Sequence, residues 1–291
     1  MSVVTGIVGR NLRLFFRDRL NVFFSLLSGI ILFVLYTLFL ARLQTDGLEA
    51  QFPQASAREV RAFIDSWMFS GIILLTTITS GMGAMSLLVD DGYSRRFADF
   101  LVSPIRRGQL VLGYLISAVT VSLIMSGVVL VLSVLYLGVV DGVWLSLATL
   151  MRIVAFIVLC CFSFTALSAF VVSFVRTPGA FSAFATVVGT ILGFVAGAYI
   201  PIGSLPPAVG DVINALPFSQ GGMLLRREFT VDSLPALADV AQAEESLRVF
   251  YGIDAYVGDA RIDPWIAVGV LLLFAVGFTA LAAGRIRSRI R

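Results

Sequence analysis

The sequence predicts an all-α, polytopic membrane protein with six transmembrane helices, and three observations support this prediction. Of the 291 residues, 58% are hydrophobic and only 13% are charged, a composition outside the range of water-soluble domains. Six uncharged runs are each long enough to cross a hydrocarbon core, which takes about 20 helical residues. Arginines concentrate in alternate connections between these runs, as expected for a chain that crosses repeatedly. We expect the crossings at residues 20–41, 66–89, 110–138, 152–175, 179–200 and 264–284.

Residues 1–19 precede the first crossing and carry four arginines. Apolar residues recur at helical spacing from Val4 to Phe15, with Arg10 and Arg13 between them, a pattern typical of a helix in the headgroup layer. A plain basic flank is the alternative. No small-x-small cleavage site follows the first apolar run, so we expect a retained first crossing rather than a signal peptide.

The second crossing is rich in hydroxyl and glycine residues. Ser56 and Glu59 have the spacing of a capping box, which predicts a helix that runs directly into this crossing. Its hydroxyl residues include Thr76, Thr77 and Ser80. Small and hydroxyl residues indicate either close helix packing or a substrate-lining face, and both can hold on different sides of one helix.

Residues 90–109 form a charged island between two long uncharged runs. Ser94 can cap a short helix there, and Pro104 ends it. Three apolar side chains share one face of this helix: Phe97, Phe100 and Leu101. The island is therefore either a solvated loop that fixes orientation or a docking helix for a cytosolic partner.

Three glycines of the fifth crossing, Gly189, Gly193 and Gly197, repeat every four residues. This spacing predicts close approach of another helix, from the same chain or a second copy, rather than contact with a ligand. Prolines then divide an apolar stretch into pieces too short to span the membrane: Pro201, Pro206, Pro207 and Pro217. We expect residues 201–218 to enter the outer leaflet and return, covered by protein or facing water. We expect residues 219–263 to form an extracellular segment whose fold the sequence does not determine.

Two absences narrow the chemistry. The chain contains no His and no Lys, so it lacks the lysine of a P-loop and the histidine of serine–histidine or zinc-hydrolase sites. Cys160 and Cys161 are neighbours in an apolar run, which favours buried structural thiols over a redox or metal pair. We therefore expect no metal site, no cofactor held by this chain and no enzymatic activity of its own.

Charge counting predicts the orientation and the energy source. With the amino terminus, the island, the Arg176 turn and the carboxyl-terminal tail on one side, that side holds 13 of the 21 arginines, and the other side holds 14 of the 18 acids. Both termini are then cytoplasmic. No carboxylate lies deep in a predicted crossing, so proton or sodium coupling is not favoured and energy must arrive from outside the chain. A passive pore and an architectural subunit remain alternatives.

The whole chain resembles the permease subunits of ABC-2 type exporters, also called type V ABC exporters, as one domain of residues 1–291. Three stretches carry the resemblance: FFRDRLNVFF at the first crossing, the island with Gly92 and the Ser103–Pro104 step, and GAYIPIGSLPPAVGDVINALPF followed by Arg226. The island departs from the family's frequent Glu-rich, Gly-Thr form, since Asp90, Asp91 and Ser94 stand there.

This resemblance implies two permeases, identical or paralogous, in a bacterial inner or plasma membrane, with two cytosolic ATPase subunits that bind ATP and Mg²⁺. Membrane lipid surrounds the assembly, and no nucleic acid is involved. The implied coupling helix, seated on the ATPase, comprises Asp91, Arg95, Arg96, Phe97, Phe100, Leu101 and Pro104. The implied re-entrant extracellular gate comprises Tyr199, Pro201, Pro206 and Pro217. The implied substrate path comprises Thr76, Thr77, Ser80 and Phe194.

A path without buried charge, lined by hydroxyls, glycines and phenylalanines, favours a hydrophobic or amphipathic small molecule. Export of a drug or antibiotic is the first prediction. Export of a lipid-linked glycan or a lipid is the alternative, because those exporters share the topology. From a different class, a passive pore or scaffolding subunit without an ATPase also fits the sequence.

Overall fold

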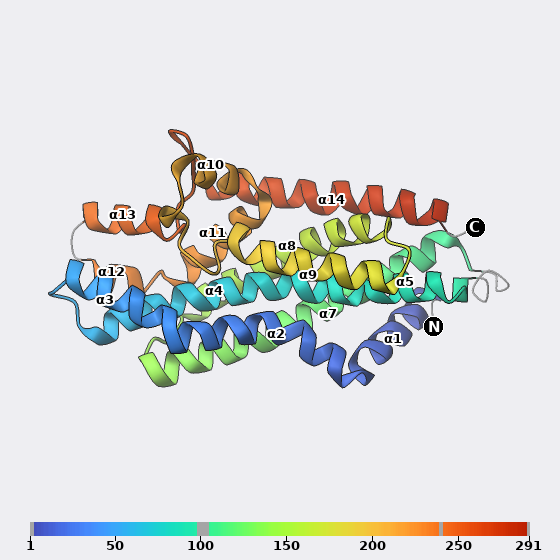
Figure 1. Cartoon of the computed structure of the whole chain (residues 1–291), viewed down its shortest axis with the longest axis horizontal. Helices are drawn as coiled ribbons and strands as arrows, with labels where there is room; N and C mark the ends of the chain where they lie inside the picture. The colour runs from blue at the N-terminus through green and yellow to red at the C-terminus, as the bar shows by residue number, and fades with distance from the viewer. Residues whose placement is uncertain (1–2, 98–104, 239–240, 290–291) are drawn as a thin grey trace.

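The computed structural model describes residues 3–97, 105–238 and 241–289 of the chain. Long helices lie along one axis, with both termini at one end and α3, α12 and α13 at the other (Figure 1). The expected all-α architecture is confirmed, and a single two-stranded hairpin is the only sheet in the described part of the chain.

Five helical spans among the described residues are long and apolar enough to cross a membrane. They are Ala57–Tyr93, Arg107–Asp141, Leu147–Val172, Pro178–Val195 and Pro264–Ile286. A sixth arises at the amino terminus, where α1 (Val3–Arg17) and residues Val22–Leu35 pass the same test as a pair bent by 77°. The bend sets α1 across the direction of the helix that follows it.

The first crossing is longer than expected. α2 (Arg19–Leu35) continues through a π-helical turn, η1 (Tyr36–Leu40), into α3 (Ala41–Gln51). The helix therefore passes the expected boundary at residue 41 and reaches the outer end of the molecule, where α3 packs on α4.

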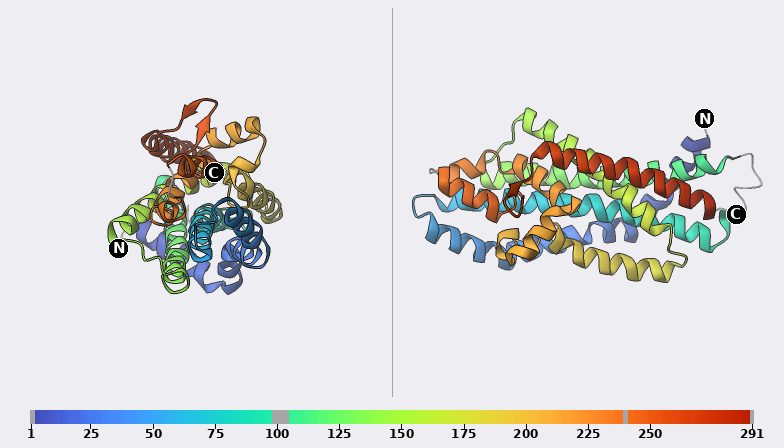
Figure 2. Two further views of the ribbon diagram at one scale, coloured as in Figure 1. Left: turned by 90° about the vertical axis from the view of Figure 1, so that its left-hand side faces the viewer. Right: turned by 90° about the horizontal axis from the view of Figure 1, so that it is seen from above.

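The central helix is α4 (Ala57–Ala84), which α5 (Ser86–Tyr93) extends. The predicted capping box is confirmed, since Ser56 Oγ accepts the Glu59 N–H at 3.3 Å and the Glu59 carboxylate accepts the Ser56 N–H at 2.7 Å. α4 is buried along most of its length by its neighbours, and the end-on view of Figure 2 shows it inside the bundle. It packs against α2, α7 (Arg107–Tyr136), α8 (Leu147–Val172) and α11.

The fifth crossing, α9 (Pro178–Val195), ends five residues before the expected boundary at residue 200. Gly197 has a left-handed φ of 61° and donates its N–H to Phe194 O at 2.9 Å. The N–H of Ala198 reaches back to Gly193 O, also at 2.9 Å. These two bonds form a Schellman cap, so the helix stops where a glycine can adopt the required conformation.

The proline-rich region forms η3 (Ile202–Ser204), α10 (Pro207–Ala215) and α11 (Pro217–Phe229). α10 and α11 each begin with a proline at the first helical position, where its missing N–H costs nothing. α11 returns into the bundle and is buried against α4, α8 and α14. The first eleven residues of the expected extracellular segment, 219–263, belong to this buried helix.

The remaining outer segment consists of short elements. They are α12 (Ser233–Leu237), α13 (Ala241–Phe250), β1 (Tyr256–Val257) and β2 (Ala260–Arg261). The two strands pair antiparallel, with Tyr256 opposite Arg261. The sixth crossing, α14 (Pro264–Arg289), then packs mainly along α8 and returns the chain to the end that holds the amino terminus.

Candidate functional site

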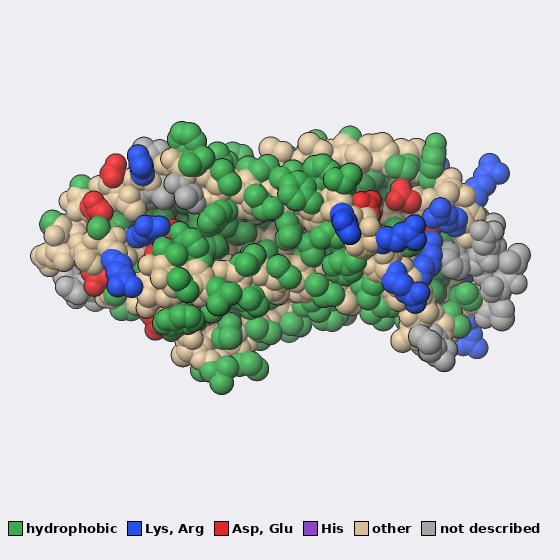
Figure 3. Space-filling model, turned by 90° about the horizontal axis from the view of Figure 1, so that it is seen from below, with side chains coloured by type: hydrophobic (Ala, Val, Ile, Leu, Met, Phe, Trp, Pro, Cys, Tyr) green, Lys and Arg blue, Asp and Glu red, His purple; other side chains and the backbone are tan. Residues whose placement is uncertain are grey.

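The surface divides the molecule into two polar ends and an apolar belt. Figure 3 shows, on the face seen from below, arginines gathered toward the end that carries the termini, and a belt of mainly hydrophobic side chains between the ends. Among the described residues, the exposed arginines of the basic end are Arg13, Arg17, Arg19, Arg95, Arg96, Arg106, Arg107, Arg176 and Arg285. A belt of this kind matches the hydrocarbon core of a bilayer.

A buried carboxylate, Asp91 of α5, gathers three side chains at the basic end. The Asp91 side chain has no exposed surface, and Arg10 of α1 donates hydrogen bonds of 2.7 and 2.9 Å to its two oxygens. The Tyr114 hydroxyl of α7 donates to the same carboxylate, and Arg96 Nη1 donates at 3.3 Å. We call these four residues the Asp91 cluster. It joins α1, α5 and α7 through charge-assisted hydrogen bonds.

α1 is also seated closely on α7. The Asn11 amide donates a hydrogen bond of 3.1 Å to Ser117 Oγ, and both side chains are buried. Ile7 lies directly on Gly113, where a Cβ atom would overlap with the Ile7 side chain. Gly113 therefore allows the two helices to approach closely, as small residues do between membrane helices.

The exposed part of the island begins directly after α5. Ser94 closes α5, because its N–H and its hydroxyl both donate to Asp90 O, at 2.9 and 2.6 Å. Arg96 and Phe97 are helical again, and the remainder of the expected short helix lies outside the described residues. Arg95 and Arg96 are exposed, and Arg95 has a left-handed φ of 59°. The chain therefore turns sharply here and presents two arginines to solvent.

Phe97 requires a correction, since we expected it on the partner-facing side of the island. It is only 9% exposed and packs edge to face on Tyr114 of the Asp91 cluster, with ring centroids 6.3 Å apart. Phe97 points inward because its ring joins an apolar cluster that includes Leu88 and Leu110, and removal of the ring from water is favourable. The other expected coupling residues Phe100, Leu101 and Pro104 lie outside the described residues.

The expected path residues of α4 also require a correction, because they face neighbouring helices and not an open surface. Thr76 and Thr77 are buried and donate their hydroxyls to Ile72 O and Leu74 O, at 2.8 and 2.7 Å. Ser80 is fully buried, and its hydroxyl has no hydrogen-bond partner among the described residues. The fourth residue, Phe194 of α9, is exposed.

The three glycines of the expected ridge have three different surroundings. A Cβ atom on Gly189 would meet nothing within 4 Å, so this position is open on the surface of α9. Gly193 is covered by the ring of Tyr199 from the same chain. Gly197 lies beyond the helix end and serves as its left-handed cap. The four-residue spacing therefore does not describe one continuous packing ridge.

The expected gate residues lie around the junction between α9 and α10. Tyr199 is half-buried, packs edge to face on Phe194, and its carbonyl accepts the Tyr36 hydroxyl at 3.4 Å. The three gate prolines each precede or start a short helix: Pro201 before η3, Pro206 before α10 and Pro217 at the start of α11. Pro201 and Pro217 are buried, whereas Pro206 is exposed.

Arg226 of α11 is a functional candidate that the sequence analysis placed outside the bundle. It is fully buried, and its guanidinium donates to Ala196 O, to Gly197 O at 2.9 Å and to Gly252 O at 3.3 Å. It also lies 5.8 Å from the ring centre of Trp67. Burial lowers the pKa of Arg226 to about 10, which leaves the side chain charged at neutral pH. In the sequence, Arg226 follows one of the stretches that carry the family resemblance and directly succeeds three apolar residues, but it was given no role.

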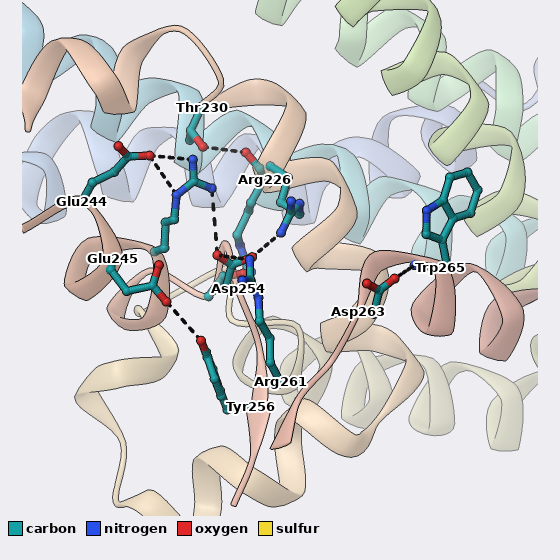
Figure 4. Close-up of polar contacts among 12 residues, drawn as sticks. Arg226, Thr230, Glu244, Glu245, Asp254, Tyr256, Arg261, Asp263 and Trp265 are labelled. Carbon is teal, nitrogen blue, oxygen red and sulfur yellow. Dashed lines mark hydrogen bonds and ion pairs between the residues drawn. The ribbon is translucent and has the colours of Figure 1, made fainter. Parts of the chain in front are cut away.

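Asp254 organises the outer segment beside Arg226 (Figure 4). This buried carboxylate pairs with Arg227 of α11, with Arg261 of β2 at 3.0 Å and, at 4.0 Å, with Arg248 of α13. The charge of Asp254 raises the pKa of Arg261. One buried acid therefore holds three elements of the outer segment together.

A carboxylate pair lies near the start of α4 and at the end of η2 (Leu137–Asp141), the π-helical turn that follows α7. Asp65 and Asp141 are both buried, and each places one oxygen 3.6 or 3.7 Å from Nε of Arg61. One oxygen on each acid has no hydrogen-bond partner among the described residues. Asp65 belongs to the helix that the Ser56–Glu59 capping box predicted, and it stands one residue before the expected crossing at 66–89.

The fold and these polar ends define a polytopic helical membrane protein with an amino-terminal helix clamped to its basic end. Residues 37–283 match the model of a family described as ABC-2 family transporter protein, and the chain belongs to this family. It is therefore the membrane permease of an ABC transporter, a transport component that is not itself catalytic. Permeases of this family associate with an ABC ATPase and are typically dimers. No curated protein matches the chain significantly.

Proposed function

We propose that this permease exports a hydrophobic or amphipathic small molecule, such as a drug or antibiotic, from a bacterial cell. A separate cytosolic ABC subunit binds ATP and Mg²⁺ and supplies the energy. The basic end, with both termini and the island, faces the cytoplasm across the inner membrane, in agreement with the excess of arginine there.

The observation that carries the proposal is the Asp91 cluster. Arg95 and Arg96 are exposed to a cytosolic partner, and Arg96 is bonded to Asp91. Asp91 is in turn bonded to Arg10 of α1 and Tyr114 of α7. Force applied to the island by an ATPase is therefore passed through Arg96 to the buried Asp91 carboxylate, and from there to the interfacial helix and to a crossing through charge-assisted bonds.

The second permease is proposed to pack on α9. Val187, Ile191 and Phe194 form an exposed apolar stripe at helical spacing. The open Gly189 lies two residues from both Val187 and Ile191, so it faces another side of the same helix, where a second element of the partner can approach closely. This contact places α9 of the two copies near the centre of the assembly.

An apolar groove next to this stripe supports the proposal of a hydrophobic or amphipathic substrate. The groove has a volume of about 280 Å³ and is enclosed by α4, α8, α9 and the start of α11. Its lining includes Ile78, Phe164, Phe184, Ile191 and Phe218. Aromatic and aliphatic walls without charge suit a hydrophobic or amphipathic molecule.

The test uses the complex that the permease forms with its ATPase, purified in mild detergent and reconstituted in liposomes. We expect ATP-dependent transport of a fluorescent amphipathic dye by the complex and no flux with this chain alone. Dye flux without nucleotide from this chain alone would identify a passive pore instead. ATP-dependent movement of a fluorescent phospholipid but not of the dye would favour the lipid-export alternative.

A further inference from the structure

Arg226 is a buried cation whose charge no acid balances. Among the residues that the structure describes, no carboxylate lies within 4 Å of its guanidinium, although Arg227 next to it pairs with Asp254. Its Nε has no hydrogen-bond partner among the same residues. An unpaired buried charge is expensive, so its retention calls for a specific role.

One nitrogen of Arg226 caps the outer end of α9. Nη2 donates to the carbonyls of Ala196 and Gly197, which follow the last turn of this helix. The carbonyl end of a helix carries the negative end of the helix dipole, so a guanidinium is favoured there. Arg226 thus compensates the desolvation of its charge with helix carbonyls rather than with an acid.

The other terminal nitrogen binds a different segment. Nη1 donates to Gly252 O, in the turn that follows α13. Gly252 and Gly197 both have left-handed φ angles, of 65° and 61°. A Cβ atom on Gly252 would lie 2.9 Å from Arg226 Nη1, and one on Gly197 would lie 3.0 Å from Nη2. The backbones on both sides therefore approach the guanidinium as closely as glycine permits.

We propose that Arg226 is a positioning residue that fastens the outer end of α9 to the turn at Gly252, so that this helix end and the extracellular segment move as one body. The planar fork of arginine can serve both segments at once, whereas the single ammonium of lysine cannot. Trp67 supports the same junction, since its indole N–H donates to Tyr251 O at 2.7 Å. The consequence for transport rests on the proposed function, but the fastening itself does not.

The test measures hydrogen–deuterium exchange of the full-length permease in nanodiscs, without an ATPase. The variants are Arg226→Lys, which keeps the charge, and Gly252→Ala, which crowds the guanidinium from the side of the turn. Gly258→Ala is the matched control: Gly258 has a similar φ of 58°, but a Cβ atom there would meet nothing within 4 Å. The backbone strain is then similar, and the differences are the contact with Arg226 and one with Ile202 Cδ1, also at 2.9 Å. Arg226→Lys separates these two contacts, because it leaves Gly252 and Ile202 unchanged.

We expect Gly252→Ala to speed exchange at residues 193–198 about tenfold, because hydrogen bonds to a charged group protect this helix end. Gly258→Ala should leave these amides unchanged. Arg226→Lys should speed exchange both there and at residues 249–256. Normal exchange at residues 193–198 in both Gly252→Ala and Arg226→Lys would overturn the proposal. Because no partner or nucleotide is present, that result would leave the proposed exporter function untouched.

Discussion

The guanidinium of Arg10 binds both carboxylate oxygens of Asp91, at 2.7 and 2.9 Å, across 81 residues of sequence. The Asp91 side chain is fully buried, and the Arg10 side chain is 28% exposed to solvent. This pair ties the interfacial helix to the end of the second crossing. It lies directly before the exposed arginines Arg95 and Arg96 of the island.

Replacement of Asp91 by Asn should destabilise the basic end. One charge of a buried pair is lost, which leaves Arg10 without its anion and costs roughly 2–4 kcal/mol. The free energy of unfolding can be measured by denaturant titration in detergent micelles. Arg96→Gln is the control, because the Arg96 side chain is 54% exposed and its bond to Asp91 is longer. Equal stability of the two variants would contradict a central role for the Arg10–Asp91 pair.

Phe97→Ala should act on stability rather than directly on partner binding. The ring is buried against Tyr114, and removal of a buried phenylalanine costs roughly 3–5 kcal/mol. Arg95→Gly offers the contrast, because glycine accepts the left-handed φ of 59° while the exposed side chain is removed. We expect Arg95→Gly to keep the melting temperature and to weaken co-purification of the ATPase. A lower melting temperature of Arg95→Gly together with normal co-purification of the ATPase would show that Arg95 supports the fold and does not contact the partner.

Gly189→Leu and Gly193→Leu should separate contacts between copies from contacts within the chain. Gly189 is open in this chain, so a leucine there harms only a partner that packs on α9. Gly193 lies under Tyr199, so a leucine there must displace that ring and loosen the α9 junction in a single copy. Mass photometry and thermal unfolding measure the two effects. A dimer that survives Gly189→Leu would show that this face of α9 contacts lipid.

Asp65→Asn should leave stability unchanged or raise it slightly. Asp65 and Asp141 share one arginine, Arg61, at 3.6 and 3.7 Å, so neutralising one acid removes a like-charge contact and leaves a balanced pair. Arg61→Gln should instead lower stability by roughly 1–2 kcal/mol, because two buried acids then lose their cation. Denaturant titration at neutral pH compares the two variants. A larger loss in Asp65→Asn than in Arg61→Gln would argue against the shared arginine.

Features that depend on local sequence were predicted well. The apolar runs and the Ser56–Glu59 capping box predicted the helices of the bundle, because a lipid environment requires each backbone group to be bonded within its own helix. Cys160 and Cys161 are free and buried, as their apolar run predicted. The match of residues 37–283 confirms the family that the motif order suggested.

Features that depend on which faces meet were predicted poorly. The position of Gly197, four residues after Gly193, fits both a packing ridge and a helix cap. Only its left-handed φ of 61° shows that it is a cap. The apolar pattern around Phe97 identified a helical face but not the direction in which it points. Arg226 was named with the proline-rich stretch, but its burial and its role were missed because its partners are backbone carbonyls, which leave no trace in the amino-acid sequence.

The sequence by itself determined that this chain repeatedly crosses a membrane, that arginine concentrates at one end and that it lacks the lysine of a nucleotide-binding loop. Each of these follows from the transfer free energy or chemistry of residues taken along the chain. Only the tertiary structure decided that Arg10 meets Asp91 and that Arg226 joins the end of α9 to Gly252. Those contacts link residues from 26 to 81 positions apart, and helix packing rather than local sequence brings them together.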